Sequence, residues 1–273
     1  FNDAHHFDIM GGYEWQHFYH RGEKDGWGLY QSSNTEKPGE KYQRDAKVWK
    51  SENYLVSFFG RANYTLLDRY MLTATVRYDG SSRFKDHWAL FPSFAFGWRL
   101  KEEAFLKDVD VLSDLKLRLG YGQTGQQEGI GDYNYFASYN VSTGNGSSYP
   151  ILGDGILYRP DAYNENLTWE TTTTYNAGID FGFWNGRLSG SVDYYYRKTT
   201  DLLNTVYVSA GSNFRNQVTS NIGSLKNTGV EIALTYRPIQ TKDLSWEITA
   251  NATYNDNEIT ESVSYTHLTL PTT

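Results

Sequence analysis

The segment 174–197, TYNAGIDFGFWNGRLSGSVDYYYR, alternates apolar and polar residues on both sides of the pair Asn185-Gly186. The apolar positions are Tyr175, Ala177, Ile179, Phe181 and Phe183 before the pair, and Leu188, Gly190, Val192, Tyr194 and Tyr196 after it. A period of two residues is the repeat of a β-strand, and Asn-Gly accepts the positive φ angles of a tight type I′ turn. The segment therefore predicts a β-hairpin with one apolar face, which must contact a protein core, a partner or lipid.

The same alternation recurs along the chain and predicts about nine strands in all. Besides the two strands of the hairpin, the candidates lie at 6–19, 54–66, 70–79, 94–100, 115–121, 230–236 and 246–254. Charged side chains fill the alternate positions of several strands, namely Arg61, Arg77, Arg118, Asp180, Asp193 and Glu231. One face of the predicted sheet is therefore apolar and the other is polar.

The connections between the predicted strands alternate in length. Short or moderate ones lie at 67–69, 101–114, 184–187 and 238–244, and long polar ones lie at 21–50, 79–88, 123–168 and 198–228. Short turns at one end and long loops at the other are typical of outer-membrane barrels. The pattern predicts an all-β, antiparallel, up-and-down transmembrane barrel, with the apolar face toward lipid and the charged positions facing the lumen.

Two other classes stay open on the residues alone: a passive porin-type channel and a soluble secreted β-sandwich glycan-binding protein. The sandwich alternates as well, but its strands are usually shorter than the predicted ones. No run approaches the roughly 20 apolar residues of a membrane helix. A mean hydropathy of −0.63 does not argue against a barrel, because lipid-facing and lumen-facing residues average out. The net charge of −7 argues against nucleic-acid binding.

Several segments resemble the SusC/RagA family of TonB-linked outer-membrane proteins of Bacteroidetes. The most specific are RYDGSSRF (77–84) with FPSFAFGWRL (91–100), and LRLGYGQTGQQ (117–127) with GDYNYF (131–136). The stretch from NENLTWE to TTDLL (164–203) and SNIGSLKNTGVEIAL (220–234) continue the resemblance in the family's order. Together these segments extend the likeness over nearly all of residues 7–260.

The resemblance implies a barrel of about 22 strands around an N-terminal plug. Residues 1–260 would then be a partial barrel, with the plug and the C-terminal strands outside the given sequence. It also implies import of oligosaccharides, or of peptides, across the outer membrane. A SusD-like surface lipoprotein and TonB, which acts through the plug, would be the protein partners. No enzymatic activity is expected.

Residues 261–273 need a separate interpretation. The strand pattern stops after Thr260, and VSYTHLTLPTT (263–273) resembles the translation of a transposase sequencing adapter. The alternative is a native strand in which Thr and Leu alternate. We expect the tail not to be native and leave it out of the fold prediction.

The sequence gives little indication of a catalytic, cofactor-binding or metal-binding site. Gly120-Tyr121-Gly122-Gln123-Thr124-Gly125 matches a dinucleotide-binding pattern but lacks the βαβ context that such a site requires, so no cofactor is expected. No metal site or catalytic set is expected either. Aromatic residues in the long connections could stack on apolar sugar faces; the candidates for ligand contact are Trp27, Tyr30, Tyr133, Tyr135, Tyr139 and Tyr158. The alternative is that these rings pack the loops against one another.

Overall fold

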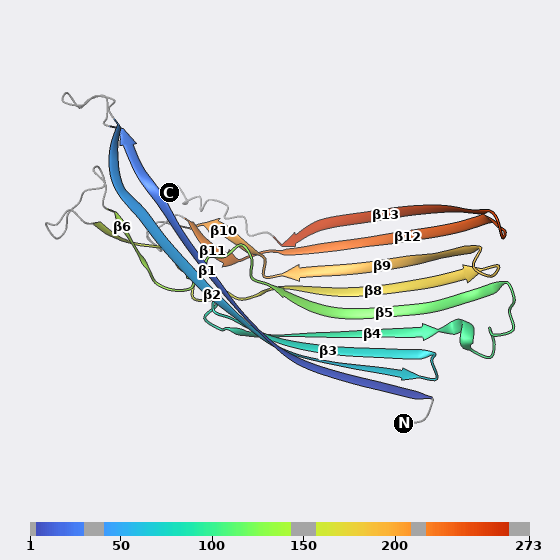
Figure 1. Ribbon diagram of the computed structural model, residues 1–273. Helices are drawn as coiled ribbons and strands as arrows, with labels where there is room; N and C mark the ends of the chain where they lie inside the picture. Colours follow the sequence, from blue (N-terminus) through green and yellow to red (C-terminus); the bar gives the residue numbers. More distant parts are fainter. Residues whose placement is uncertain (1–3, 30–40, 143–156, 209–216, 262–273) are drawn as a thin grey trace, which may run out of the picture.

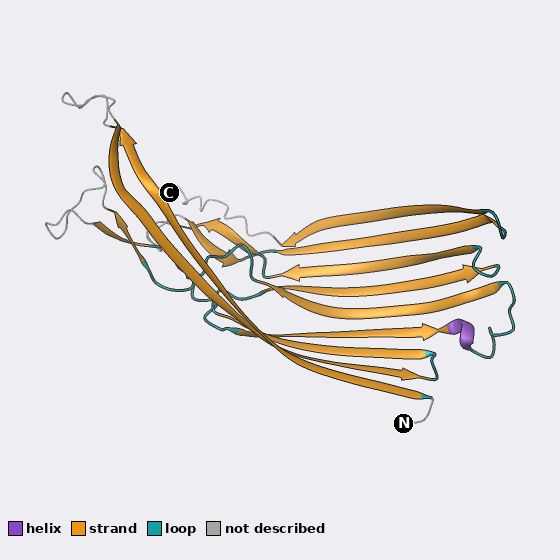
Figure 2. Cartoon of the chain, viewed as in Figure 1, coloured by secondary structure: helices purple, strands orange, loops and turns teal. Residues whose placement is uncertain are grey.

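The computed structural model describes residues 4–29, 41–142, 157–208 and 217–261, with only the backbone for 24–29, 41–48, 140–142 and 157–160. Nearly all of the regular structure is β-strand, and the helix drawn in Figure 2 is a single 3-10 turn, Leu100–Glu102 (η1). Among the described residues, no helix is long and apolar enough to span a membrane. The predicted tail, 261–273, lies outside the described residues apart from Glu261.

In the described part of the chain, nine strands form one antiparallel sheet in the order β1-β2-β3-β4-β5-β8-β9-β12-β13. Their bounds are β1 His5–Leu29, β2 Lys41–Leu66, β3 Tyr70–Ser81, β4 Trp88–Arg99, β5 Leu112–Gln126, β8 Glu170–Phe183, β9 Leu188–Thr200, β12 Ser224–Gln240 and β13 Ser245–Glu261. Each strand pairs with its neighbour in the chain once the small inserted hairpins are passed over. The up-and-down order predicted from the connections is confirmed. A sandwich would need two packed sheets, so the sandwich alternative is wrong for this part of the chain.

The register aligns the apolar positions of neighbouring strands. Ile179 of β8 lies opposite Leu117 of β5 and Val192 of β9, and Val192 lies opposite Ile232 of β12. These side chains are exposed although they are apolar, with Ile179 45% and Ile232 37% accessible. Because side chains alternate across a strand, this register gives the sheet one continuous apolar face and one polar face.

The predicted boundaries differ from the structure at the long connections. The expected loop 21–50 is largely strand, because β1 and β2 pair from His5↔Leu66 as far as Leu29↔Lys41. Figure 1 shows this ribbon extending well past the other strands. The expected loops 123–168 and 198–228 contain two-stranded sheets of their own, formed by β6 Tyr139–Ser142 with β7 Leu157–Pro160 and by β10 Leu203–Tyr207 with β11 Gln217–Asn221. Backbone pairing within these loops gives partners to N–H and C=O groups that would otherwise bond to water.

Candidate functional site

Three strands meet in an ion-pair network on the polar face. Arg118 of β5 makes two hydrogen bonds to Asp180 of β8, both at 2.8 Å, and a third to Asp193 of β9 at 3.0 Å. All three side chains are partly exposed. The bidentate Arg–carboxylate geometry fixes the guanidinium, so this network stiffens the middle of the sheet.

Arg77 forms a second network on the same polar face, near the edge of the sheet that β1 forms. Its Nε donates to Asp79 at 2.7 Å, and its Nη2 donates to Glu14 of β1 at 3.1 Å and to Ser57 of β2 at 2.8 Å. The guanidinium therefore joins three adjacent strands, β1, β2 and β3. Glu14 also accepts a hydrogen bond from Gln16.

The remaining two charged positions also lie on the polar face. Arg61 donates to Thr75 at 3.2 Å, and Glu231 lies opposite Asp193 in the β9–β12 register. The register thus brings all six predicted charged residues onto the face opposite Ile179 and Ile232, and it pairs four of them into the two networks. Sequence alternation could place them on one face but could not predict which pairs form.

A small hydrophobic core lies at the end of the sheet where the long connections meet. It consists of Phe84, Phe91, Ile130, Leu167 and Trp169, all buried, with Phe84 completely inaccessible. The ring centroids of Phe84 and Phe91 lie 5.0 Å and 5.6 Å from that of Trp169. The core joins the β3–β4 connection, the segment after β5 and the segment before β8, so these three loops form one packed unit.

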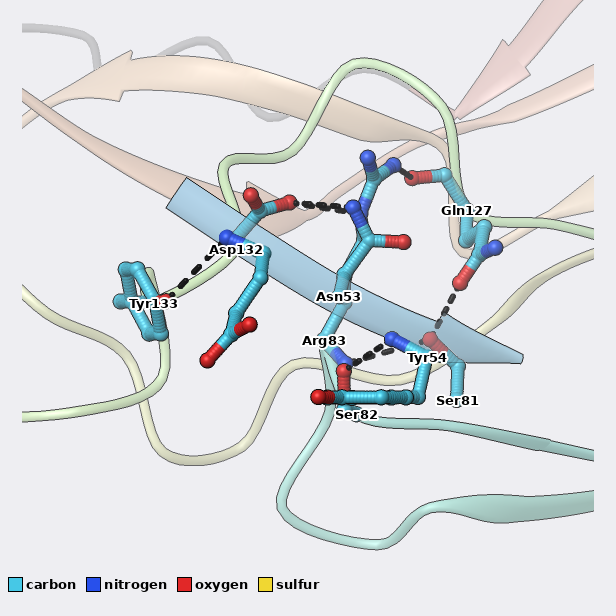
Figure 3. Close-up of polar contacts among 9 residues, drawn as sticks. Asn53, Tyr54, Ser81, Ser82, Arg83, Gln127, Asp132 and Tyr133 are labelled. Atoms are coloured by element: carbon cyan, nitrogen blue, oxygen red, sulfur yellow. Dashed lines mark hydrogen bonds and ion pairs between the residues drawn. The ribbon is translucent and has the colours of Figure 1, made fainter. Parts of the chain in front are cut away.

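The motif DGSSRF supplies the polar contacts of this unit (Figure 3). Arg83 donates from Nε to Asp132 at 3.1 Å and from Nη1 to the carbonyl of Gln127 at 3.3 Å. Asp132 also accepts from the Asn53 side chain at 3.0 Å. Ser81 bonds the side chain of Gln127, so the β3–β4 connection is tied to the segment after β5 at two places.

The same unit is attached to strand β2 and to β11. Ser82 Oγ accepts from the backbone N–H of Tyr54 at 2.9 Å, and Asn164 donates to Thr219 O at 3.2 Å. Thr168 N donates to the side chain of Asn221 at 2.9 Å, and Asn221 donates back to Thr168 O at 2.8 Å. Four segments that are distant in sequence are therefore held in one arrangement above the polar face.

A cavity of about 770 Å³ lies between this loop unit and the polar face. Its apolar lining includes Phe18, Leu55, Phe91 and Trp169, of which Phe18 is 42% exposed, and its polar lining includes Arg77, Gln123 and Arg83. Rings beside amide and guanidinium groups can hold a ligand that has both apolar and hydroxyl-bearing or amide-bearing surfaces.

Sequence reasoning missed Phe91 and Trp169. Phe91 lies opposite Arg77 in the β3–β4 register, so it belongs to the polar face. The signal available in the sequence was that Phe91 is out of phase with Phe94 and Phe96 of the same strand. Trp169 precedes β8 and had no periodic pattern to reveal it; its Nε1 donates to the carbonyl of His87 at 3.3 Å.

The aromatic residues predicted to contact ligand differ in their exposure and in their contacts. Tyr133 is half exposed and its hydroxyl accepts from the backbone N–H of Glu52 at 3.3 Å, Tyr135 packs edge-on against Phe136, and Tyr139 is largely exposed. Trp27 lies in β1 and Tyr158 in β7, where only the backbone is described, and Tyr30 lies outside the described residues. Of the three predicted loop aromatics whose side chains are described, Tyr133, Tyr135 and Tyr139, the last is the most exposed.

No group of three or more His, Asp or Glu side chains in the described ranges could hold a metal ion. The N-terminal histidines have separate partners: His5 contacts Tyr64, and His17 pairs with Glu52 at 3.3 Å.

Comparison with known proteins agrees with this architecture. The chain matches the family described as "TonB dependent receptor-like, beta-barrel" over residues 2–273. It is 53% identical over 262 residues to TonB-dependent receptor SusC of Bacteroides thetaiotaomicron, covering 94% of this chain and 26% of that protein. It is 37% identical over 213 residues to TonB-dependent receptor P39 of Formosa agariphila, covering 76% of this chain and 19% of that protein. The chain thus spans about a quarter or less of the length of these relatives.

Among solved structures, the chain is similar to the RagAB peptide transporter, with a TM-score of 0.77 and 30% identity over 96% of this chain and 29% of that one. A likeness in fold alone extends to the outer membrane transporter YddB of Escherichia coli, with a TM-score of 0.59 and 11% identity. The resemblance inferred from the sequence motifs is therefore confirmed. The chain belongs to the TonB-dependent receptor β-barrel family of outer-membrane proteins, in the branch that contains SusC and RagA.

Proposed function

We propose that the protein containing this chain imports oligosaccharides across the outer membrane, in a complex with a SusD-like surface lipoprotein and with energy supplied by TonB. The observation that carries the proposal is the 53% identity to SusC over nearly the whole chain. A match to TonB-dependent receptors supports energised import over the passive porin alternative.

The geometry supports a carbohydrate more than an ion as the substrate. The cavity beside the loop unit combines the partly exposed ring of Phe18 with Arg77 and Gln123, and pyranose rings stack on accessible aromatic faces while amide and guanidinium groups bind hydroxyls. Import of peptides is the second candidate, because a solved structure similar to this chain is described as a peptide transporter.

In this proposal the polar face lines the lumen, with Arg61, Arg77, Arg118, Asp180, Asp193 and Glu231 facing the pore. The exposed loop aromatics, foremost Tyr139 and Tyr133, would contact the substrate at the entrance, as would Trp27, Tyr30, Tyr135 and Tyr158.

Uptake by intact cells tests the proposal directly. A strain that lacks the full-length gene is complemented with wild-type protein, and uptake of a labelled oligosaccharide panel and a labelled peptide pool is measured with and without TonB. We expect TonB-dependent uptake of oligosaccharides. Uptake of peptides alone would select the second candidate, and uptake that persists without TonB would contradict energised import.

A matched pair of variants tests the entrance residues. Tyr139 is 67% exposed at the loop end, and Tyr139→Ala should raise the substrate concentration needed for half-maximal uptake. Tyr254 is 70% exposed but lies opposite Val230 on the apolar face, and Tyr254→Ala should leave that concentration unchanged. Equal effects of the two changes would contradict the role assigned to Tyr139.

A further inference from the structure

The ribbon formed by β1 and β2 continues beyond the end of strand β3. Strand β3 ends at Ser81, which pairs with Leu55, whereas β1 and β2 go on pairing with each other past this row. In Figure 1 the two strands extend past the others on the side of the long connections. Side chains in this extension are described for residues 17–23 and 49–54. The extension adjoins the cavity, which its residue Phe18 helps to line.

The two faces of the extension differ in charge. The face that continues the polar face of the sheet carries Phe18, His20, Gly22, Trp49, Ser51 and Asn53, and so has no Asp, Glu, Lys or Arg. The opposite face carries Arg21, Glu23, Lys50 and Glu52. In the wall below, charged side chains such as Glu14 and Arg77 lie on the polar face. The charge pattern is therefore reversed in the extension, and the face on the cavity side has no permanently charged group.

Two large rings are exposed on this uncharged face. Phe18 is 42% and Trp49 is 51% accessible. Trp49 pairs with Gly22 and its ring lies over that glycine, since a Cβ atom there would lie 2.4 Å from the ring. Phe18 and Gly22 are four residues apart in β1, so the two rings are roughly 13 Å apart along the ribbon at about 3.3 Å per residue. The exposed side chain of His20 lies between them.

The cavity end of this face contains a polar group that lacks a partner. Asn53 lies opposite Phe18, lines the cavity and is 1% exposed. Its Nδ2 donates to Asp132 at 3.0 Å, whereas its Oδ1 has no hydrogen-bond partner among the described residues. Buried acceptors of this kind are rare and costly. A hydroxyl group of a ligand seated beside Phe18 would supply the missing donor.

The chemistry of this face fits a chain of uncharged sugars. Accessible rings accept the apolar faces of pyranoses, and the amide, hydroxyl and imidazole groups between the rings can bind hydroxyls. A ligand held by its charge would need a partner of opposite charge, and this face offers no permanent one. Because the rings lie one beyond the other, a longer chain can contact more of them than a short one.

We infer that this face of the ribbon is a carbohydrate-binding track, which runs from Trp49 at its outer end through Phe18 into the cavity and binds uncharged oligosaccharides more tightly as their length increases. Phe18 contacts short and long chains, and Trp49 contacts only chains that extend out of the cavity. The inference rests on the proposed import of oligosaccharides and adds to it a preference for chain length.

Calorimetric titration of the full-length protein in detergent tests the track. The probes are α-glucan, fructan and mannan oligosaccharides, each as a heptasaccharide and as a disaccharide, and the weaker disaccharide is measured by displacement of the heptasaccharide. Trp49→Ala should raise the dissociation constant of the heptasaccharide several-fold and leave that of the disaccharide unchanged. Trp49→Phe, which keeps a ring, should retain most of the heptasaccharide affinity, and Phe18→Ala should weaken both probes.

Tyr19→Ala is the matched control. Tyr19 is 53% exposed on the same ribbon but lies on the opposite face, so this change should alter neither dissociation constant. Equal effects of Trp49→Ala and Tyr19→Ala would overturn the inference, and so would an equal loss for the two chain lengths in Trp49→Ala. Wild-type protein that binds none of the three glycans would contradict the proposed function, and the inference would fall with it. Wild-type binding that Trp49→Ala leaves intact would contradict the inference alone.

Thiol labelling provides a second measurement that keeps both rings. The given sequence contains no cysteine, so Ser51→Cys and Lys50→Cys each introduce a single thiol once any cysteines elsewhere in the full chain are replaced. Ser51 lies between the two rings, opposite His20, and Lys50 lies on the other face. The heptasaccharide bound by the wild type should slow maleimide labelling of Ser51→Cys several-fold and leave the rate for Lys50→Cys unchanged. Equal rates with and without sugar at Ser51→Cys, or equal slowing at both positions, would overturn the inference.

Discussion

Arg118 of β5 forms an ion pair with Asp193 of β9 at 2.9 Å, although strand β8 lies between them. Gly178 is the residue of β8 that lies opposite both partners in the register. A Cβ atom at this position would lie 2.2 Å from the Asp193 carboxylate and 2.9 Å from Arg118 Nη2. The glycine leaves the space through which the guanidinium crosses the strand.

We expect Gly178→Ala to break the link between Arg118 and Asp193 while leaving the bond to Asp180 in place. The loss should be about 1 kcal/mol of unfolding free energy, since the pair is partly solvated. Urea unfolding of the full-length protein in detergent, followed by tryptophan fluorescence, measures it. Gly122→Ala is the matched control on the same face, because its Cβ would meet only Ser93 at an ordinary 3.4 Å; equal losses from both variants would contradict the explanation.

Placing a charge on the apolar face should be costly. Ile179 lies between Leu117 and Val192 on this face, and an arginine at mid-bilayer depth on a barrel's lipid face costs roughly 2–4 kcal/mol. We expect Ile179→Arg to lower the free energy of unfolding of the protein in lipid vesicles by that amount.

Ser191→Arg is the control for the lipid-facing assignment. Ser191 lies on the polar face opposite Asp180, so the added arginine stays hydrated and near a carboxylate, and the variant should unfold like the wild type. Similar losses for Ile179→Arg and Ser191→Arg would show that the two faces are assigned wrongly. Asp180→Asn would be a poorer control, because Asp180 accepts two hydrogen bonds from Arg118 that this change would disturb.

The two ion pairs at the β3–β4 connection should differ in energy. Arg83 and Asp132 are 19% and 7% exposed, whereas Lys85 and Glu165 are 57% and 56% exposed. Arg83→Ala leaves the buried Asp132 carboxylate without its cation and should cost about 3 kcal/mol. Lys85→Ala removes a solvated pair and should have no measurable effect. Urea unfolding of both variants checks this difference, and the prediction fails if Lys85→Ala costs as much as Arg83→Ala.

Gly125 makes room for the loop core. A Cβ atom there would lie 2.1 Å from the ring of Phe91, which is buried against Trp169. Gly125→Ala should therefore cost about 1–3 kcal/mol by overpacking. The double variant with Phe91→Leu should recover part of that loss, and thermal unfolding of the single and double variants measures the recovery. Additive losses would indicate that the two positions do not compete for space.

Alternation of side chains predicted the sheet well, because strand pairing and the period of two follow from local geometry. The segment 174–197 forms the expected hairpin, with β8 and β9 joined by a turn at Asn185 and Gly186 that have positive φ. The networks of Arg118 and Arg77 could not be predicted, since they depend on the register between neighbouring strands and on side-chain conformations. Phe91 and Trp169 were missed for a related reason: they pack between loops, where no period marks the buried positions.

The β4–β5 connection should respond to acid. Hydrogen bonds from the Tyr70 hydroxyl and from Trp98, followed by the charge of Arg69, hold the pKa of Glu103 below its ordinary value of 4.5. A carboxyl group whose pKa is lowered by folding stabilises the folded state fully above its ordinary pKa, and this contribution is lost as the pH falls through the lowered value. We therefore expect the connection to be ordered at neutral pH and to loosen well below pH 4.5.

Hydrogen exchange of residues 100–111 in the full-length protein, compared at neutral and acidic pH, measures this loosening against the strands as an internal reference. Glu103→Gln should exchange faster at neutral pH and should show little further change in acid, because its side chain does not titrate. Glu102→Gln, one residue earlier, alters a side chain that is exposed and should keep the wild-type profile. Acid loosening that persists in Glu103→Gln would assign the effect to another group.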